Sequence, residues 1–333
     1  MGTQRTIAFV GHRYHLEQYT RGLYDALGQR FDIRFTWVDD GWPESIADIS
    51  GHDEADACIW FVRFRELIER PGFRWGDFAG VRVMLEHDAV QNFAVSESRY
   101  IGAWPEVFHR NDFQVLASSG KATSERLAAA GVPSYWLPKG YDAARMFDLD
   151  LERNGIGYYG MAYQARRAML DYLQRRRVGF TSFRCQSFEL NEHLNQFLGC
   201  LICNMEGIVG RGLGRVMHRL SPSRGLVLKS GLEPMIKNFE VPGAGCAPIC
   251  DEIDELADLG FADGDTMVSY RTFDELVEKL DHYGRAPEDL REIGRRGNTL
   301  VQSRHTWDDR AEQLEDFIAR QMCPTPKIAP TAP

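Results

Sequence analysis

With 333 residues, 44% of them hydrophobic and 26% charged, the chain is long enough for two globular domains, and its composition excludes a wholly disordered protein. The net charge of −9 at pH 7 disfavours a general nucleic-acid binder, because such proteins need an electropositive face to displace counterions from phosphate. No apolar run reaches the ~18–20 residues of a membrane span, and the N-terminus lacks the apolar segment of a secretion signal. We therefore expect a cytoplasmic protein.

The seven cysteines are odd in number and scattered along the chain, a pattern that argues against a disulfide scaffold. Two pairs, Cys200 with Cys203 and Cys246 with Cys250, have spacings that zinc ligands also show. Both pairs lie in apolar runs typical of buried strands, and no second pair or ligand-spaced histidine lies nearby to complete four-fold coordination. We interpret them as reduced thiols of the core.

Along the first half, short apolar runs typical of buried strands alternate with helical segments. The expected strands span 6–10, 31–38, 57–62, 81–85, 113–117 and 135–137, with helices including 16–27 and 122–127. Such alternation predicts right-handed crossovers and a parallel sheet with both faces covered. A stop signal made of Gly131 and Pro133 ends the last of these helices.

The second half repeats the pattern after a polar stretch. Strands are expected at 155–159, 179–183, 199–203, 225–229, 247–250 and 266–270, and helices at 164–176, 190–197, 235–242, 272–283, 287–302 and 307–322. We predict an α/β protein of two doubly wound, Rossmann-like domains that face each other across a cleft. The first domain comprises residues 1–145 and the second 155–322, and the Pro-rich end, 323–333, is expected to be an unstructured tail.

In open parallel sheets, ligands bind beyond the carboxyl ends of the strands. The site is therefore expected to involve residues 11–15, 86–93 and 160–167, together with the loop before Glu240.

One segment carries a family resemblance. Lys237-Asn-Phe-Glu-Val-Pro-Gly-Ala-Gly245 resembles the R-x-F-E-x-x-A-x-G stretch of GT-B glycosyltransferases of group 1, in particular the spore-maturation type related to the retaining family four. The similarity continues in ordered pieces between residues 113 and 315, at 137–142, 157–160, 261–270, 273–276, 294–298 and 305–310. It implies the GT-B fold, a nucleotide-sugar donor bound by the second domain, and an acceptor on the side of the first domain.

The resemblance also implies roles for single residues. Glu240 would accept hydrogen bonds from the two ribose hydroxyls of the donor, as a carboxylate can with both oxygens; its alternative role is that of an acidic residue at a helix N-terminus. Lys237, where the family usually has Arg, and Arg166 would face the diphosphate. Lys229 is a third candidate cation, with the alternative that it only flanks the sheet.

Small and polar residues complete the predicted donor site. Gly160 and Gly243 would let the backbone approach the donor, although tight packing of a helix on a strand explains Gly243 equally well. Asn238 lies within the same segment as Glu240. The family often has two glutamates separated by seven residues, whereas Glu233 precedes Glu240 with six between them, so Glu233 receives no assigned role.

Candidate catalytic groups of the first domain are His87 and Asp88, which follow an expected strand, and His12 in the loop after the first strand. A His-Asp pair at a strand end is a plausible acceptor-activating group. Helix capping is the alternative for Asp88, and an ordinary loop position is the alternative for His12. If the reaction retains the anomeric configuration, the departing phosphate itself takes the acceptor proton and no enzymic base is required.

The sequence therefore predicts a glycosyltransferase that moves a sugar, most simply from a UDP-sugar, to a small-molecule or polymer acceptor with retention. No divalent metal is implied, because GT-B enzymes use cationic side chains and helix N-termini at the diphosphate. The alternatives are an inverting enzyme with a His/Asp base and a non-catalytic GT-B scaffold that binds a nucleotide or partner. An oxidoreductase is disfavoured because no Gly-x-Gly-x-x-Gly follows the first strand, and a nucleic-acid acceptor is disfavoured by the net charge.

Overall fold

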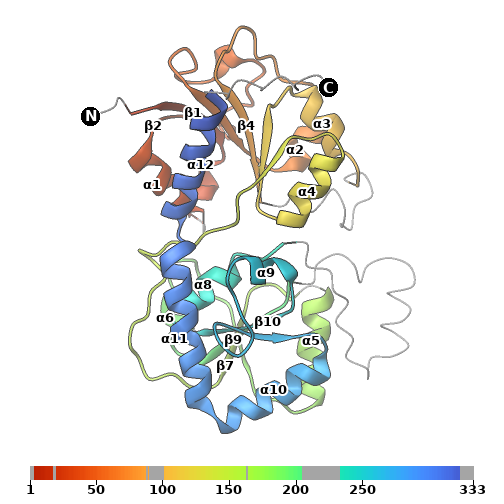
Figure 1. Cartoon of the computed structure of the whole chain (residues 1–333), viewed down its shortest axis with the longest axis vertical. Coiled ribbons are helices and arrows are strands. Elements are labelled where there is room, and N and C mark those ends of the chain that lie inside the picture. Colours follow the sequence, from red (N-terminus) through yellow and green to blue (C-terminus); the bar gives the residue numbers. More distant parts are fainter. Residues whose placement is uncertain are drawn as a thin grey trace, which may run out of the picture.

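Two parallel β-sheets, one in each half of the chain, organise the computed structural model of the protein (Figure 1). The structure describes residues 4–17, 20–87, 89, 101–162, 164–204 and 233–322. The expected strand at 225–229, with Lys229, the candidate catalytic residue Asp88 and the expected tail at 323–333 lie outside these residues.

The first sheet has six strands in the order β2-β1-β3-β4-β5-β6, all paired in parallel. Their bounds are β1 Thr6–Gly11, β2 Asp32–Trp37, β3 Ala57–Phe61, β4 Val81–Glu86, β5 Val115–Ser118 and β6 Ser134–Trp136. The helices of this half are η1 Arg13–Glu17, α1 Arg21–Arg30, η2 Ile46–Asp48, α2 Phe64–Ile68, α3 Trp104–Arg110 and α4 Lys121–Ala129. The single helix expected at 16–27 is thus a 3₁₀ turn followed by α1.

The second sheet has five parallel strands in the order β11-β10-β9-β7-β8. They are β7 Ile156–Tyr159, β8 Thr181–Phe183, β9 Gly199–Ile202, β10 Ala247–Asp251 and β11 Val268–Tyr270. The helices are α5 Gln164–Arg175, α6 Leu190–Leu194, α8 Lys237–Gly243, α9 Asp254–Asp258, α10 Phe273–Arg285, α11 Pro287–Arg304 and α12 Trp307–Met322. The chain runs from β7 outward to β8 and then crosses to β9 on the other side of β7, which makes a topological switch point between β7 and β9.

The predicted α/β fold with two doubly wound parallel sheets is confirmed. Continuous apolar runs such as those of β1, β3 and β10 are almost wholly buried, as expected of strands covered on both faces. The cysteine pairs lie in this core, where Cys200, Cys203, Cys246 and Cys250 are buried. Among the helices that the structure describes, none is long and apolar enough to cross a membrane.

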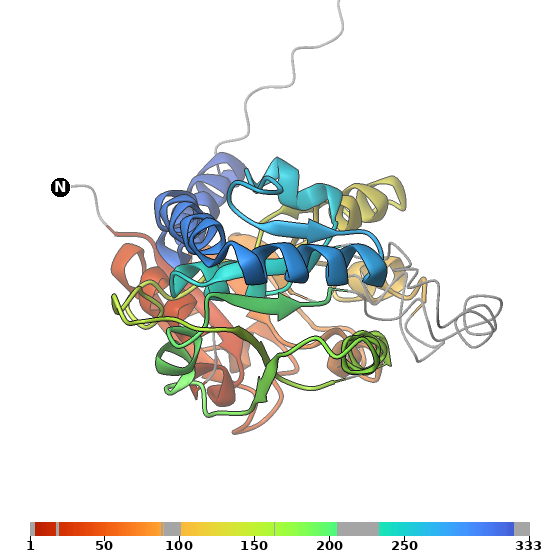
Figure 2. The ribbon, with the colours of Figure 1, turned by 90° about the horizontal axis from the view of Figure 1, so that it is seen from below.

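Helix α12 follows α11 of the second half but packs on the first sheet. Its residues Trp307, Leu314 and Phe317 belong to the same buried cluster as Ile7 of β1 and Leu23 of α1. Arg30 of α1 also pairs with two acidic side chains of α12, Glu312 at 3.0 Å and Glu315 at 3.1 Å. The chain therefore returns to the first half at its end, although 155–322 was predicted as one domain (Figures 1 and 2).

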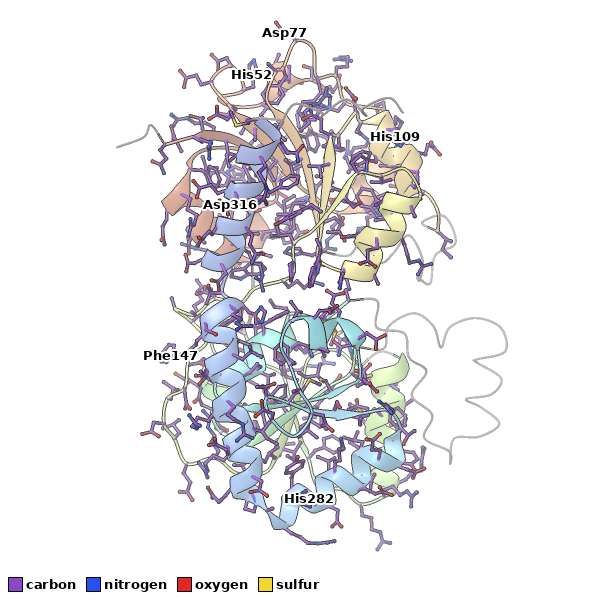
Figure 3. All side chains as sticks on the ribbon, in the orientation of Figure 1. His52, Asp77, His109, Phe147, His282 and Asp316 are labelled. Carbon is purple, nitrogen blue, oxygen red and sulfur yellow. The ribbon has the colours of Figure 1, made fainter. Side chains whose placement is uncertain are left out.

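The side-chain view shows the same division. Asp316 of α12 lies beside the first half, which also carries His52, Asp77 and His109, whereas His282 of α10 lies at the opposite end of the molecule (Figure 3). Side chains fill the space between the sheets and their helices in both halves.

Candidate functional site

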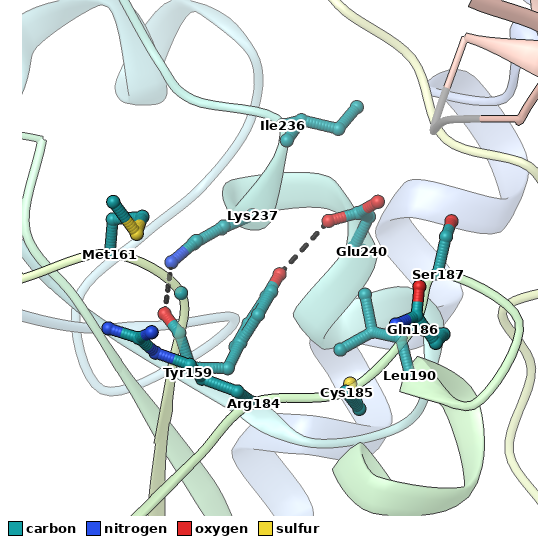
Figure 4. A pocket seen from close by; sticks show the side chains of 11 residues that line it. Tyr159, Met161, Arg184, Cys185, Gln186, Ser187, Leu190, Ile236, Lys237 and Glu240 are labelled. Carbon is teal, nitrogen blue, oxygen red and sulfur yellow. Dashed lines mark hydrogen bonds between the residues drawn. The ribbon is translucent and has the colours of Figure 1, made fainter. Parts of the chain in front are cut away.

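A pocket of about 410 Å³ lies in the second half, at the carboxyl ends of β7 and β8 and the beginning of α8 (Figure 4). Its walls come from three short segments and one further side chain: Tyr159, Gly160 and Met161; Arg184, Cys185, Gln186 and Ser187; Ile236, Lys237 and Glu240; and Leu190. This position, beside the switch point between β7 and β9, is where a doubly wound sheet binds its ligands.

Gly160 shapes the pocket through its backbone. It follows β7 with φ of 90°, a conformation that side chains other than glycine rarely adopt. A Cβ atom at this position would lie 2.8 Å from Nζ of Lys237. The positive φ thus favours glycine at this turn, and the absence of a Cβ atom leaves room for the end of the Lys237 side chain.

Glu240 reaches the pocket from the first turn of α8 and is buried, with 7% of its surface exposed. Its Oε2 accepts a hydrogen bond of 2.9 Å from the hydroxyl of Tyr159, the last residue of β7 (Figure 4). Burial raises the pKa of Glu240 to about 7, against the opposing effects of this hydrogen bond and of the Lys237 charge. The pocket therefore contains a desolvated carboxyl group, and additional hydrogen-bond donors would stabilise its ionised form.

Two cations border the same pocket. The ammonium group of Lys237 donates to the carbonyl oxygen of Tyr159 and lies 4.1 Å from the centre of the Tyr159 ring (Figure 4). Arg184 directly follows β8 and is exposed. Within the described part of the chain, no hydrogen bond or ion pair engages the Arg184 guanidinium. Positive charge is thus available beside Glu240 at the pocket wall.

Two other predicted donor-site residues, Arg166 and Asn238, lie outside the pocket lining. The guanidinium of Arg166 is buried and donates to the carbonyl oxygens of Cys203 and Met161, both at 3.2 Å. Asn238 is buried and accepts a 3.0 Å hydrogen bond from the backbone of Met235, at the start of α8.

Gly243 lies against the connecting segment between the halves. A Cβ atom there would lie 2.6 Å from the ring of Tyr141. The contact is close packing, although against the connecting segment and not against a strand as the sequence alternative had it. A role of Gly243, Asn238 or Arg166 toward a donor stays a prediction.

His87 follows β4 in the first half and is buried, with 4% exposed. Its ring stacks on Trp307 of α12, with ring centres 5.7 Å apart, and meets the edge of Phe61 at 4.9 Å. Burial lowers the pKa of His87 well below its ordinary value, and the nearby charge of Lys139 acts in the same direction. The imidazole is therefore neutral at physiological pH.

His12 is clamped between two carboxylates. Its Nδ1 lies 3.0 Å from Oδ1 of Asp39, and its Nε2 lies 3.0 Å from Oε2 of Glu66. A neutral imidazole has one donor and one acceptor nitrogen, so two carboxylate partners require the doubly protonated ring. Burial lowers the pKa of His12, but the hydrogen bonds and charges of Glu66 and Asp39 outweigh burial and raise it above its ordinary value. Both nitrogens are thus used in a structural clamp at the end of β1.

Glu233 lies between the two halves and is buried, with 8% exposed. Its Oε1 is 3.2 Å from Nζ of Lys139, and its Oε2 is 3.0 Å from the hydroxyl oxygen of Ser119. Both partners belong to the first half, where they follow β6 and β5.

Sequence reasoning did not identify Tyr159, Arg184, Ser119 or Lys139 as site residues. A signal existed for the first two, because each stands at the carboxyl end of an expected strand, where ligands of parallel sheets bind. Ser119 and Lys139 also follow strands, but their partner Glu233 is 114 and 94 residues away in the chain. Only the tertiary structure shows that pairing.

The comparisons with known proteins agree with this architecture. Residues 215–316 match the family model described as glycosyl transferase-like. The chain resembles sucrose-phosphate synthase from Thermosynechococcus elongatus, with a TM-score of 0.59, 11% identity, and coverage of 96% of this chain and 100% of the other. No curated protein sequence matches the chain.

Two further solved structures have the same fold. Anabaena HepE in complex with UDP and glucose matches with a TM-score of 0.58 and 10% identity, covering 95% of this chain and 99% of HepE. An alpha-glucosyltransferase in complex with UDP and a 13-mer DNA containing an HMU base matches with a TM-score of 0.59 and 8% identity, covering 94% of this chain and 99% of that one.

The fold is therefore GT-B, with two Rossmann-like halves and a pocket at the strand ends of the second. The predicted resemblance to GT-B glycosyltransferases thus agrees with the fold and with the glycosyl transferase-like model that matches residues 215–316.

Proposed function

We propose that the protein transfers a sugar from a nucleotide-sugar, with UDP as the nucleotide, to an acceptor held on the side of the first half. The observation that carries the proposal is the buried carboxyl group of Glu240 in the pocket beside Lys237. Solved structures of the same fold support the choice of nucleotide, because HepE and the alpha-glucosyltransferase were both crystallised with UDP.

Glu240 would hold the ribose of the donor. Tyr159 occupies one acceptor position of Oε2. An ionised carboxylate offers about four such positions on its two oxygens, so the two ribose hydroxyls have acceptors left. Hydrogen bonds from these hydroxyls replace the water that burial removes, and they favour the ionised form of the group.

Lys237 and Arg184 would face the diphosphate. Negative charge builds on the departing diphosphate as the anomeric C–O bond breaks, and fixed cations lower the energy of that charge. The ammonium group of Lys237 lies at the pocket wall, where it donates to the Tyr159 carbonyl. Arg184 presents an exposed guanidinium whose planar fork matches two phosphate oxygens.

We further propose that the reaction retains the anomeric configuration, with the leaving phosphate accepting the acceptor proton. The clamp on His12 is consistent with this assignment, because neither of its nitrogens has a lone pair to serve as a base. An inverting reaction would need a base, for which the neutral His87 is the candidate. NMR of the anomeric proton of the product distinguishes the two outcomes.

A thermal-shift screen against UDP-, GDP- and dTDP-sugars tests the proposal, since a donor that binds the folded state raises the melting temperature. We expect a UDP-sugar to raise it in the wild type and not in Glu240→Ala. A protein that responds to none of these donors would contradict the proposed function.

A further inference from the structure

The contact between Glu233 and the first half is built from groups that are costly to bury. The side chains of Lys139 and Glu233 are 7% and 8% exposed, and their charged atoms are 3.2 Å apart. Each buried charge is tolerable only when its partner is held in place, because removing one partner leaves an uncompensated charge. The pair therefore favours one relative position of the two halves over others.

Further hydrogen bonds fix the same position. Nζ of Lys139 also donates to the carbonyl oxygen of Pro234, at 3.4 Å. The hydroxyl oxygen of Ser119 lies 3.0 Å from Glu233 Oε2 and 3.0 Å from the carbonyl oxygen of His87, so its single proton can donate to either. The ends of β4, β5 and β6 thus converge on the segment that leads into α8.

The backbone of Lys139 is anchored as well. Its carbonyl oxygen accepts a 3.2 Å hydrogen bond from Nε of Arg310, a residue of α12 that is 1% exposed. Helix α12, which packs on the first half, therefore fixes the backbone of Lys139. Its ammonium group is directed at the residues before α8, which carries Lys237 and Glu240.

We propose that Lys139 and Glu233 form an interdomain latch that positions α8, and with it the donor pocket, against the first half. Glu233 is then a positioning residue, because each of its oxygens lies within hydrogen-bond distance of a group of the first half. The consequence for catalysis rests on the proposed function, whereas the coupling of the two residues does not.

Three variants test the latch against the wild type: Lys139→Met, Glu233→Gln and the double variant. Isothermal titration with a UDP-sugar gives the donor affinity, and kcat is measured at saturating donor and acceptor. We expect each single variant to bind the donor within about threefold of the wild type and to lose kcat by about 10- to 100-fold, the effect of a misplacement on the order of 1 Å. The double variant should be no worse than the weaker single variant, because the two residues act as one unit.

An exposed ion pair between the two halves provides a matched control. Lys121 of α4 pairs with Asp258 of α9 at 2.8 Å, with the side chains 38% and 45% exposed. Because exposed ion pairs contribute little, Lys121→Met is expected to leave kcat and donor affinity unchanged. If the buried pair only stabilised the fold, its variants would lower the free energy of unfolding, and kcat would not fall by more than the donor affinity does.

Each outcome decides the proposal. If Glu233→Gln weakens donor binding tenfold or more while Lys139→Met does not, Glu233 is a donor ligand and the latch is wrong. If the single variants do not fold, the double variant decides. Wild-type kcat in the double variant would overturn the latch. Reduced kcat with unchanged donor affinity would support it. If the wild type binds no nucleotide-sugar, the proposed function fails, and the double-mutant cycle on unfolding by denaturant decides alone: coupling supports the latch and additivity overturns it.

Discussion

The hydroxyl of Tyr159 donates a hydrogen bond of 2.9 Å to Oε2 of Glu240, so the last residue of β7 holds the carboxyl group that projects from α8. Burial raises the pKa of Glu240 to about 7, and this hydrogen bond opposes the rise. The protonation state of Glu240 therefore depends on whether Tyr159 is in position to donate this hydrogen bond.

Donor affinity is expected to depend on pH through Glu240. Below about pH 7 the carboxyl group is protonated, so UDP-sugar affinity should rise as the pH increases through that value and then level off. Tyr159→Phe removes a hydrogen bond that favours the ionised form, so its midpoint should lie at higher pH. Isothermal titration over a pH series measures both curves. Equal loss of affinity at every pH in Tyr159→Phe would contradict this explanation.

The same shift affects stability with a defined sign. Because the pKa of Glu240 in the folded protein exceeds the 4.5 of the free side chain, folding favours the protonated form. Its contribution to the free energy of unfolding therefore falls as the pH rises from 4.5 to about 7. Glu240→Gln should remove this contribution to the pH dependence.

Lys237 is expected to act on the diphosphate rather than on the nucleoside. Lys237→Met should weaken UDP-sugar binding by about 10- to 100-fold, the loss expected for one charged hydrogen bond, and should change uridine binding far less. Arg167→Met, in an exposed residue of α5, serves as the control and should bind both ligands normally. Equal losses for uridine and the UDP-sugar would show that the lysine does not contact the diphosphate.

His12 should titrate above its ordinary pKa of 6.5 because Asp39 and Glu66 hold both of its nitrogens. Its stabilising contribution is complete below 6.5 and is lost as the pH rises through the higher pKa of the folded protein. Denaturant unfolding of the wild type and of His12→Asn should therefore give a stability difference that shrinks with rising pH. NMR of the imidazole protons locates the midpoint, and a value at or below 6.5 would refute the clamp.

Helix α12 is expected to stabilise the first half, on which it packs. Leu314→Ala empties a wholly buried position in that core and should cost about 2–5 kcal/mol of unfolding free energy. Met322→Ala, at the exposed end of the same helix, should change it by less than about 0.5 kcal/mol. Comparable losses for the two variants would show that the packing of α12 contributes little.

Much of the fold follows from local pattern, because buried parallel strands appear as continuous apolar runs. The expected strand at 155–159 is β7 at Ile156–Tyr159, and that at 247–250 is β10 at Ala247–Asp251. Helix α9 was not predicted, since its five residues, Asp254–Asp258, are too few to show a helical period.

The site was predictable where one segment carries it. Glu240 and Lys237 lie one turn apart on α8 and both line the pocket, as their spacing indicated. Tyr159 was not predicted as a site residue, because a tyrosine that ends a buried strand has the same sequence pattern as one that fills the core. The return of α12 to the first half likewise depends on which sheet its apolar face covers, which the helical period alone does not specify.

The most direct test of the account is the affinity of Glu240→Ala for a UDP-sugar that binds the wild type. Loss of a charged hydrogen bond should cost at least about 1.5–3 kcal/mol of binding free energy, measured by isothermal titration above pH 7. Glu278→Ala, in an exposed glutamate of α10, is the control and should bind as the wild type does. Unchanged donor affinity in Glu240→Ala would contradict the assignment of this pocket to the nucleotide.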